Sequence, residues 1–230
     1  MSFILEGIGK AFALLLSGDE ETMSAIFTTI KTTNLSLLGS LIIGAPLGFL
    51  LGYFSFPGKG AIRLCVDTLL SFPTVVIGLI AYALFTAKGP LGGAELLFTI
   101  PGIAMAQTLL ALPIVIALTA SAIETQDKGL RDTLLTLGAN PIQLLRTSLY
   151  EARFAVLLAA ATAYGRIVSE VGISMMVGGN IKWHTRTITT AIALETGKGQ
   201  FEQGIALGLV LLFIALVVNI VLTVVRRREC

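Results

Sequence analysis

Long uncharged runs alternate with short polar segments along the 230-residue chain. Each long run can cross a membrane as a helix, because the hydrocarbon core needs roughly 20 helical residues. We expect about five spans, at roughly Ala25–Phe54, Leu64–Thr86, Pro101–Ile123, Phe154–Met176 and Gln203–Val225. Charged residues make up 13% of the chain, against about 25% in soluble domains. The pattern predicts an all-α integral membrane protein with one domain over residues 1–230.

The first residues have a different pattern. Ile4 and Ile8 recur at helical spacing, while Glu6 and Lys10 fall elsewhere on the helical wheel. A secretory signal peptide is disfavoured, because the charged n-region is missing. The pattern predicts an interfacial amphipathic helix over residues 1–18. A short sixth span is the alternative.

Loop charges predict the orientation of the chain. Lys and Arg concentrate in one alternating set of loops, which comprises residues 59–63, the segment 124–153 and the tail 226–228. The opposite set carries fewer basic and more acidic residues. Since Lys and Arg collect on the cytoplasmic side, we expect the N-terminus outside and the C-terminus in the cytoplasm.

The segment 124–153 is unusually polar for this chain and is expected to form two short amphipathic helices. Gly138 supplies a helix stop, Asn140 a good N-cap and Pro141 a favoured first helical residue. The apolar faces comprise Leu130, Leu134 and Leu137 in the first helix and Ile142, Leu145 and Leu149 in the second. This corner could cover the ends of its own spans or dock into a groove of another protein. The residue pattern leaves both interpretations open.

Several polar residues lie inside the predicted spans, where such residues are uncommon. Arg166 and Glu170 lie four residues apart in the fourth span, hence on one helical face. Charges at that depth are rare and often functional. A structural ion pair is the first interpretation and an anion contact the second. Thr74, Gln107 and Ser169 could also line a polar route, although hydroxyls often bond their own helix.

The segment 177–200, expected outside, is rich in glycine and polar residues. Its Lys182, His184 and Arg186 could attract an anion or pair with acidic residues. With this one histidine and two cysteines, Cys65 and Cys230, the chain has no metal-ligand spacing. It also lacks the phosphate-binding motif of P-loop proteins, and its scattered basic residues argue against nucleic acid.

The stretch "DTLLTLGANPIQLLRTSLYEAR" (132–153) resembles the EAA loop of ABC-type import permeases. It keeps the centre Leu137–Pro141, with Asp132 six residues before the glycine. It departs where Asp-Thr-Leu replaces Glu-Ala-Ala, and no proline follows Leu149. The stretches 71–82, 111–119 and 169–212 are similar to the molybdate, tungstate and sulfate branch of these permeases, and the last is most like the tungstate type.

This resemblance implies a type I ABC importer permease fold with a cytoplasmic coupling helix. It also implies a homodimer in a prokaryotic inner membrane, two ATP-binding subunits that bind ATP and Mg, and an external binding protein that delivers tungstate or a related oxyanion. This chain would bind no cofactor. The expected ATPase contacts are Asp132, Leu137, Gly138, Ala139, Asn140, Pro141 and Leu145. Lys182, His184 and Arg186 would face the binding protein.

Other functions stay open from the sequence. Molybdate and sulfate are also tetrahedral dianions, so either could be the substrate. An ATP-independent secondary transporter is a rival, although the internal repeats common in such folds are not evident. A membrane scaffold would leave the organised cytoplasmic corner without a purpose. An enzyme is least favoured, because no nucleophile, base or metal ligands converge in the sequence.

Overall fold

The computed structural model describes residues 8–9, 13, 16–125 and 136–228. Most of the N-terminal helix expected over 1–18 lies outside these residues. Asp132 and all but the end of the first of the two expected cytoplasmic helices also lie outside them.

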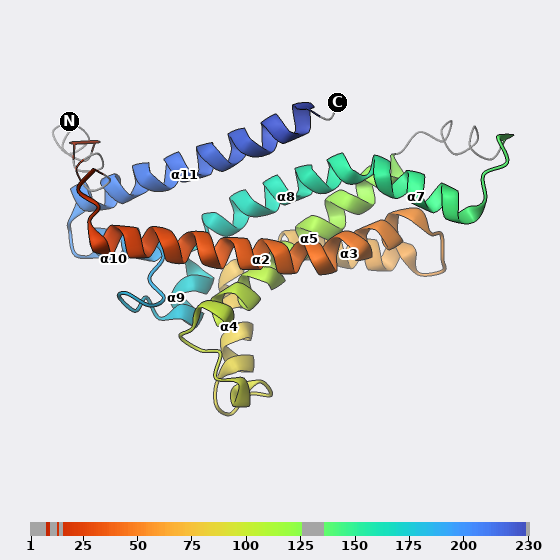
Figure 1. Cartoon of the computed structure of the whole chain (residues 1–230). Helices are drawn as coiled ribbons and strands as arrows, with labels where there is room; N and C mark the ends of the chain where they lie inside the picture. Colours follow the sequence, from red (N-terminus) through yellow and green to blue (C-terminus); the bar gives the residue numbers. More distant parts are fainter. Residues whose placement is uncertain (1–7, 10–12, 14–15, 126–135, 229–230) are drawn as a thin grey trace.

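Every regular element in the described residues is a helix, which confirms the all-α prediction. The elements are α2 (Glu20–Tyr53), α3 (Lys59–Leu70), α4 (Thr74–Phe85), the 3-10 turn η1 (Gly92–Ala94), α5 (Ile100–Glu124), α7 (Pro141–Glu151), α8 (Arg153–Val168), α9 (Gly172–Gly178), α10 (Ile188–Gly197) and α11 (Phe201–Arg228). Helix α2 runs most of the length of the molecule, and α11 follows an outer edge (Figure 1).

Three of the expected spans are single helices, since α2, α5 and α11 are each long and apolar enough to cross a membrane. The other two correspond to helix pairs, α3 with α4 bent by 99° and α8 with α9 bent by 63°. Each pair is one span only if its two helices are taken together, and we call these pairs the broken spans. Pro73 directly precedes α4, where the preference of pre-proline residues for extended backbone ends α3. No proline marks the second break, although Ser169 and Gly172 lie beside it. The span expected to be continuous over Phe154–Met176 is therefore interrupted.

The tightest packing joins α2 to α5, and we call this contact the α2–α5 seam. Small residues recur every four positions along one face of α2: Ser36, Ser40, Gly44, Gly48 and Gly52 are all partly or fully buried. A Cβ on Gly48 would lie 2.7 Å from the Ile116 carbonyl oxygen, and one on Gly52 would lie 2.7 Å from that of Ala120. Small residues at this spacing let helix backbones approach closely in membranes.

A second packed region lies where the broken spans meet α5. Helices α4, α5 and α9 share an apolar core that comprises Ile77, Ala81, Phe85, Ala106, Leu110, Ile173 and Val177. Gly178 packs so closely that an added Cβ would lie 2.6 Å from Ile103 Cδ1. These contacts hold α4 and α9, the helices that follow the two breaks, against α5.

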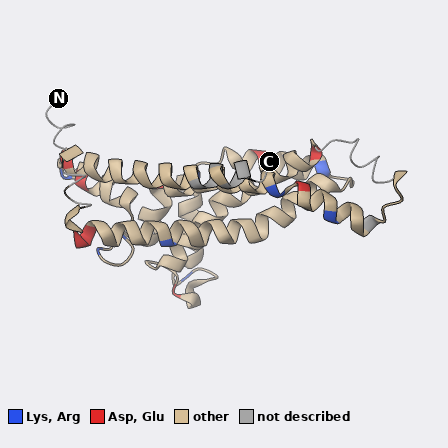
Figure 2. Cartoon of the chain, turned by 45° about the horizontal axis from the view of Figure 1, so that its top comes forward, with Lys and Arg blue, Asp and Glu red and all other residues tan. Residues whose placement is uncertain are grey.

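Charged residues lie mainly toward the two ends of the long helices (Figure 2). Beyond the C-terminal end of α2, Lys59 lies 3.0 Å and Arg63 3.6 Å from carboxylate oxygens of Glu124. At its N-terminal end, Glu21 pairs with Lys182 and Arg186. The long helices therefore separate two charged layers.

Candidate functional site

The polar corner before α7 has the predicted geometry. Gly138 has φ +78°, a left-handed conformation that glycine adopts without the penalty of a Cβ. The Asn140 side chain accepts a hydrogen bond from the Gln143 N–H at 2.9 Å, and the Gln143 side chain accepts one from the Asn140 N–H at 2.8 Å. This capping box confirms the predicted N-cap at Asn140 and helix start at Pro141. Gln143 was missed, although an Asn followed three residues later by Gln is a visible signal.

The apolar residues of the corner do not share one environment. Leu144, which the predicted stripe omitted, is the buried leucine of α7. Leu145 and Leu149 line an apolar hollow of about 780 Å³ together with side chains of α2 and α8. Leu137 is 77% exposed and Ile142 64% exposed. The corner therefore presents apolar side chains that the described part of the chain leaves uncovered.

Arg166 and Glu170 meet at the break between α8 and α9. Arg166 Nη1 lies 3.1 Å from Glu170 Oε2, and the Glu170 side chain is only 4% exposed. Glu170 Oε1 also accepts a hydrogen bond from the Ile173 N–H at 3.3 Å. The predicted ion pair is therefore present, and Glu170 additionally caps the first turn of α9, a role that no sequence pattern indicated.

The exposed side of this break borders a hollow of about 500 Å³, which we call the α8 hollow. Its lining residues are Leu70, Ile114, Ala117, Leu118, Thr162, Gly165, Arg166 and Ser169. The Arg166 side chain is 41% exposed. The hydroxyl of Thr162 donates to Leu158 O at 2.9 Å and that of Ser169 to Gly165 O at 3.0 Å. Both hydroxyls thus bond their own helix, and Arg166 is the charged residue among those that line this hollow.

A buried polar chain connects the seam to the same break. Gln107 accepts a hydrogen bond from the Ser36 hydroxyl at 3.0 Å and donates one to Ser174 Oγ at 3.1 Å. The hydroxyls of Ser174 and Thr189 both donate to the Glu170 carbonyl oxygen, at 3.4 and 3.0 Å. Gln107 is buried, so it belongs to this internal network in the single chain. Thr74 lies at the other break, as the first residue of α4.

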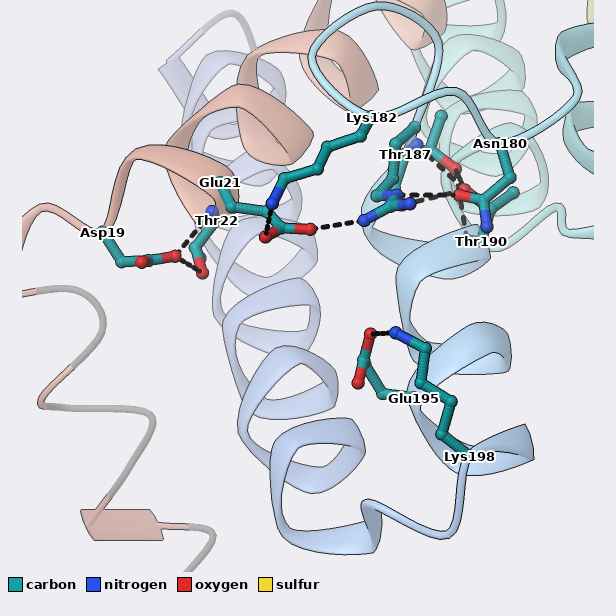
Figure 3. A network of polar contacts seen from close by, with 10 residues as sticks. Asp19, Glu21, Thr22, Asn180, Lys182, Thr187, Thr190, Glu195 and Lys198 are labelled. Atoms are coloured by element: carbon teal, nitrogen blue, oxygen red, sulfur yellow. Dashed lines mark hydrogen bonds and ion pairs between the residues drawn. The ribbon is translucent and has the colours of Figure 1, made fainter.

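The loop that carries Lys182, His184 and Arg186 lies at the N-terminal end of α2, where Lys182 faces Glu21 (Figure 3). Glu21 Oε2 lies 2.6 Å from Lys182 Nζ, and Glu21 Oε1 pairs with Arg186. Arg186 Nε also donates to Asn180 Oδ1 at 3.2 Å. The structure therefore brings Lys182 and Arg186 together on an acid that sequence reasoning did not include. His184 is exposed and lies outside these contacts.

Backbone geometry shapes the loop that holds these cations. Gly179, Asn180 and Trp183 all have positive φ values, of +69°, +51° and +66°. Thr187 then caps α10 in a reciprocal contact with Thr190. Lys182 and Arg186 line a polar hollow of about 410 Å³ with Glu21 and Lys198. This hollow opens at the same end of the molecule as the Glu21 ion pairs.

Asp19 borders this polar hollow and begins α2. Its carboxylate accepts hydrogen bonds from the Thr22 hydroxyl at 2.7 Å and the Thr22 N–H at 2.9 Å. These two bonds hold the pKa of Asp19 below its ordinary value, with a smaller contribution from Lys182. In the described part of the chain, no group of three or more His, Cys, Asp or Glu side chains could hold a metal ion.

Comparisons with known proteins agree with this architecture. Residues 44–229 match the family described as binding-protein-dependent transport system inner membrane component. A tungstate uptake system permease protein of Campylobacter jejuni is 50% identical, over 96% of this chain and 92% of the relative. A protein of the same description from Peptoclostridium acidaminophilum is 35% identical over 96% and 97%. A molybdenum transport system permease of Azotobacter vinelandii is 28% identical over 80% and 85%.

Solved structures resemble the fold at lower identity. A chain of the MetNI methionine ABC transporter in an inward-facing conformation aligns with a TM-score of 0.74 at 20% identity, over 91% of this chain and 96% of that chain. A chain of a bacterial alginate ABC transporter, crystallised with its alginate-bound periplasmic protein, aligns with a TM-score of 0.76 at 18% identity, over 97% and 87%. The fold is therefore that of a type I ABC importer permease.

Proposed function

The chain belongs to the family of binding-protein-dependent transport system inner membrane components, and from this premise we propose that it is the permease subunit of an ATP-driven tungstate importer. The observation that carries the proposal is its similarity to two tungstate uptake permeases over nearly their whole lengths. The molybdenum relative is more distant, which ranks molybdate behind tungstate as the substrate. Sulfate is likewise ranked behind tungstate, because the sulfate transport permeases are similarly distant relatives.

The working unit we propose contains two copies of this chain and two separate ATP-binding subunits. Those subunits bind ATP and Mg and hydrolyse the ATP, and this chain conducts the anion. An external binding protein delivers the substrate. Pairing is supported by the small number of spans, which enclose a path more readily as a symmetric pair. Large apolar side chains exposed along α2 and α11, such as Ile42 and Phe213, suit contact with lipid or with the second copy.

We assign the corner before α7 to the cytoplasm and the Glu21 cluster to the outside. The N-terminus would then lie outside and the C-terminus inside. The two charged layers at opposite ends of α2 support this assignment, because they match the two alternating sets of loops. A chain that crosses the membrane several times must place such layers on its two faces.

The corner at Leu137–Pro141 would couple this chain to the ATP-binding subunit. Exposed Leu137 and Ile142 would enter a groove of that subunit, in a helix-in-groove contact. The capping box of Asn140 and Gln143 makes the start of α7 rigid. Leu145 faces the inner hollow between α2 and α8, so movement of the corner would reach both helices.

The two remaining groups of predicted residues have separate roles in the proposed transport. Thr74, Gln107, Arg166, Ser169 and Glu170 mark the translocation path around the helix breaks. Lys182, His184 and Arg186 form the docking surface for the binding protein. Lys182 and Arg186 already pair with Glu21. An acidic docking residue would therefore compete with Glu21, while His184 is exposed and directly accessible.

Elemental analysis of cells with and without the gene tests the proposed substrate. Cells would grow in trace tungstate and molybdate with excess sulfate, and a plasmid copy of the gene would serve as the control. We expect the deletion to lower cellular tungsten alone and the plasmid to restore it. A fall in molybdenum or sulfur instead would replace the substrate but keep the importer. No change in any of the three would contradict oxyanion import.

A matched pair of glycines tests the coupling role. Gly138 and Gly199 both have positive φ values, and an added Cβ at either would meet nothing within 4 Å. Gly138→Arg and Gly199→Arg therefore impose the same backbone strain and bulk at opposite ends of the folded molecule (Figure 1). We expect Gly138→Arg to abolish ATP-driven uptake at normal membrane abundance, and Gly199→Arg to retain it. If Gly138→Arg still imports the wild-type number of anions per ATP hydrolysed, the coupling role is contradicted.

A further inference from the structure

Arg166 combines two properties that are hard to reconcile with a purely structural role. It belongs to a span, where an uncompensated charge against hydrocarbon is costly, and yet its side chain is 41% exposed. The hollow that it borders is otherwise lined by apolar residues, by glycine and by hydroxyls bonded to their own helix. A guanidinium in this position needs water or a polar ligand opposite it.

The two broken spans converge on this hollow. Leu70 is the last residue of α3 and Ser169 directly follows α8, and both line the hollow. An added Cβ on Gly172, the first residue of α9, would lie 3.8 Å from Val75 in the first turn of α4. Discontinuous membrane helices commonly frame substrate sites, because their interrupted backbones and half-helix ends face the bound ion.

Glu170 is held in place by several contacts. One carboxylate oxygen pairs with Arg166 and the other accepts the Ile173 N–H. Its backbone carbonyl accepts from the hydroxyls of Ser174 and Thr189. Glu170 is therefore an anchored and buried group, whereas its partner Arg166 reaches the hollow. The charge that a passing solute would meet is that of the arginine.

The geometry points to Arg166 as a direct contact for the transported dianion, with Glu170 as the positioning residue that holds the guanidinium at the break. This inference rests on the proposed import of an oxyanion and adds the residue that meets it. A planar guanidinium presents paired N–H donors, which suit two oxygens of a tetrahedral oxyanion. Gly165 leaves room beside it, because an added Cβ there would meet nothing within 4 Å.

Charge-neutral double substitution separates a substrate contact from a structural pair. Arg166→Gln leaves Glu170 buried without its partner, so a loss of uptake by this single variant has two explanations. Arg166→Gln with Glu170→Gln removes both charges and keeps side chains that can bond each other. We expect the double variant to assemble like wild type, measured as membrane abundance and copurification with the ATP-binding subunit. Its tungstate uptake should remain at least about tenfold lower, the loss typical of a hydrogen bond to a charged group.

The matched control is Arg63 and Asp67, an arginine–carboxylate pair with the same spacing of four, whose charged atoms lie 3.5 Å apart. Arg63→Gln with Asp67→Asn makes the same kind of chemical change away from the α8 hollow and should leave uptake unchanged, because Lys59 still pairs with Glu124. Uptake by the Arg166 and Glu170 double variant within about twofold of wild type would overturn the inference and leave a structural pair. This limit lies well below the loss expected for a charged contact.

A second variant tests the hollow if the double variant fails to assemble. Gly165→Leu places a side chain in the hollow and keeps both charges of the ion pair, and Gly208→Leu adds the same side chain in α11, where a Cβ also meets nothing within 4 Å. We expect Gly165→Leu to lower uptake by about tenfold or more at normal abundance, and Gly208→Leu to have no effect. Wild-type uptake by Gly165→Leu would overturn the inference.

The two levels of the proposal fail in distinguishable ways. Wild-type uptake would be measured for tungstate, molybdate and sulfate in the same assay. If wild type carries none of them, oxyanion import is wrong and the role of Arg166 falls with it. If wild type carries one and the double variant or Gly165→Leu carries it equally well, import stands and only the role of Arg166 is wrong.

Discussion

The α2–α5 seam and the α8 hollow both contain glycines inside membrane helices, but the surroundings of those glycines are opposite. At Gly48 an added Cβ would lie 2.7 Å from a backbone oxygen, and at Gly165 it would meet nothing within 4 Å. In the seam, glycine is required because two backbones touch. In the hollow, glycine leaves a space in front of a charged side chain. The same residue type thus serves rigid packing at one place and an open route at the other.

The largest effect is expected from closing the seam. Gly48→Ala forces a methyl group against the Ile116 backbone, and overpacking of this kind typically costs about 1–3 kcal/mol. Thermal unfolding of the purified chain in detergent measures the change. Gly208→Ala in α11 is the control, because its Cβ meets nothing within 4 Å. Equal stability of the two variants would show that the seam is not tightly packed.

Removing the buried hydrogen bonds at the Ser36 end of the seam should cost less stability. Gln107→Leu removes the hydrogen bonds with Ser36 and Ser174, and polar contacts between membrane helices average about 0.6 kcal/mol each. We expect a loss of about 1 kcal/mol in the same unfolding measurement. Asn219→Leu, at an exposed amide of α11, is the control. A larger loss for Asn219→Leu than for Gln107→Leu would contradict the network.

A substitution in the α8 hollow should change the free energy of unfolding in the opposite direction. Gly165→Ala adds a side chain where there is space, and replacing glycine by alanine inside a helix stabilises it by about 1 kcal/mol or less. We therefore expect the free energy of unfolding to rise slightly, in contrast to Gly48→Ala. Destabilisation by Gly165→Ala would mean that the hollow is closed in the folded chain, and the comparison between the two regions would fail.

The smallest effect concerns the cap at the start of α2 and depends on pH. The pKa of Asp19 lies below its ordinary value of 3.8 because Thr22 donates two hydrogen bonds to the carboxylate. Its contribution to stability is therefore complete above that pH and is lost as pH falls through the folded pKa. Asp19→Asn keeps the cap without titrating. We expect the stability of wild type relative to this variant to fall on acidification by less than about 1 kcal/mol, and a constant difference would contradict the shifted pKa.

The sequence alone determined the elements whose cause is local. Runs of apolar residues long enough for the hydrocarbon core predicted the spans, and Gly138, Asn140 and Pro141 predicted the corner, because glycine, cap and proline preferences act within a few residues. Arg166 and Glu170 were expected to pair from their spacing of four. The period of small residues along α2 was also visible in the sequence and could have predicted the seam.

Only the tertiary structure decided what those residues meet. The break at Glu170 has no proline, and Ser169 and Gly172 beside it were too weak a signal to predict it. Contacts from α5 and α10, which reach it through Ser174 and Thr189, hold the broken geometry. Lys182 and Arg186 meet Glu21 across more than 150 residues of chain, a distance that no local pattern spans. Whether a glycine closes a seam or opens a hollow likewise depends on the helix opposite it. Local preferences fix where helices begin and end, and long-range packing fixes which side chains remain exposed for function.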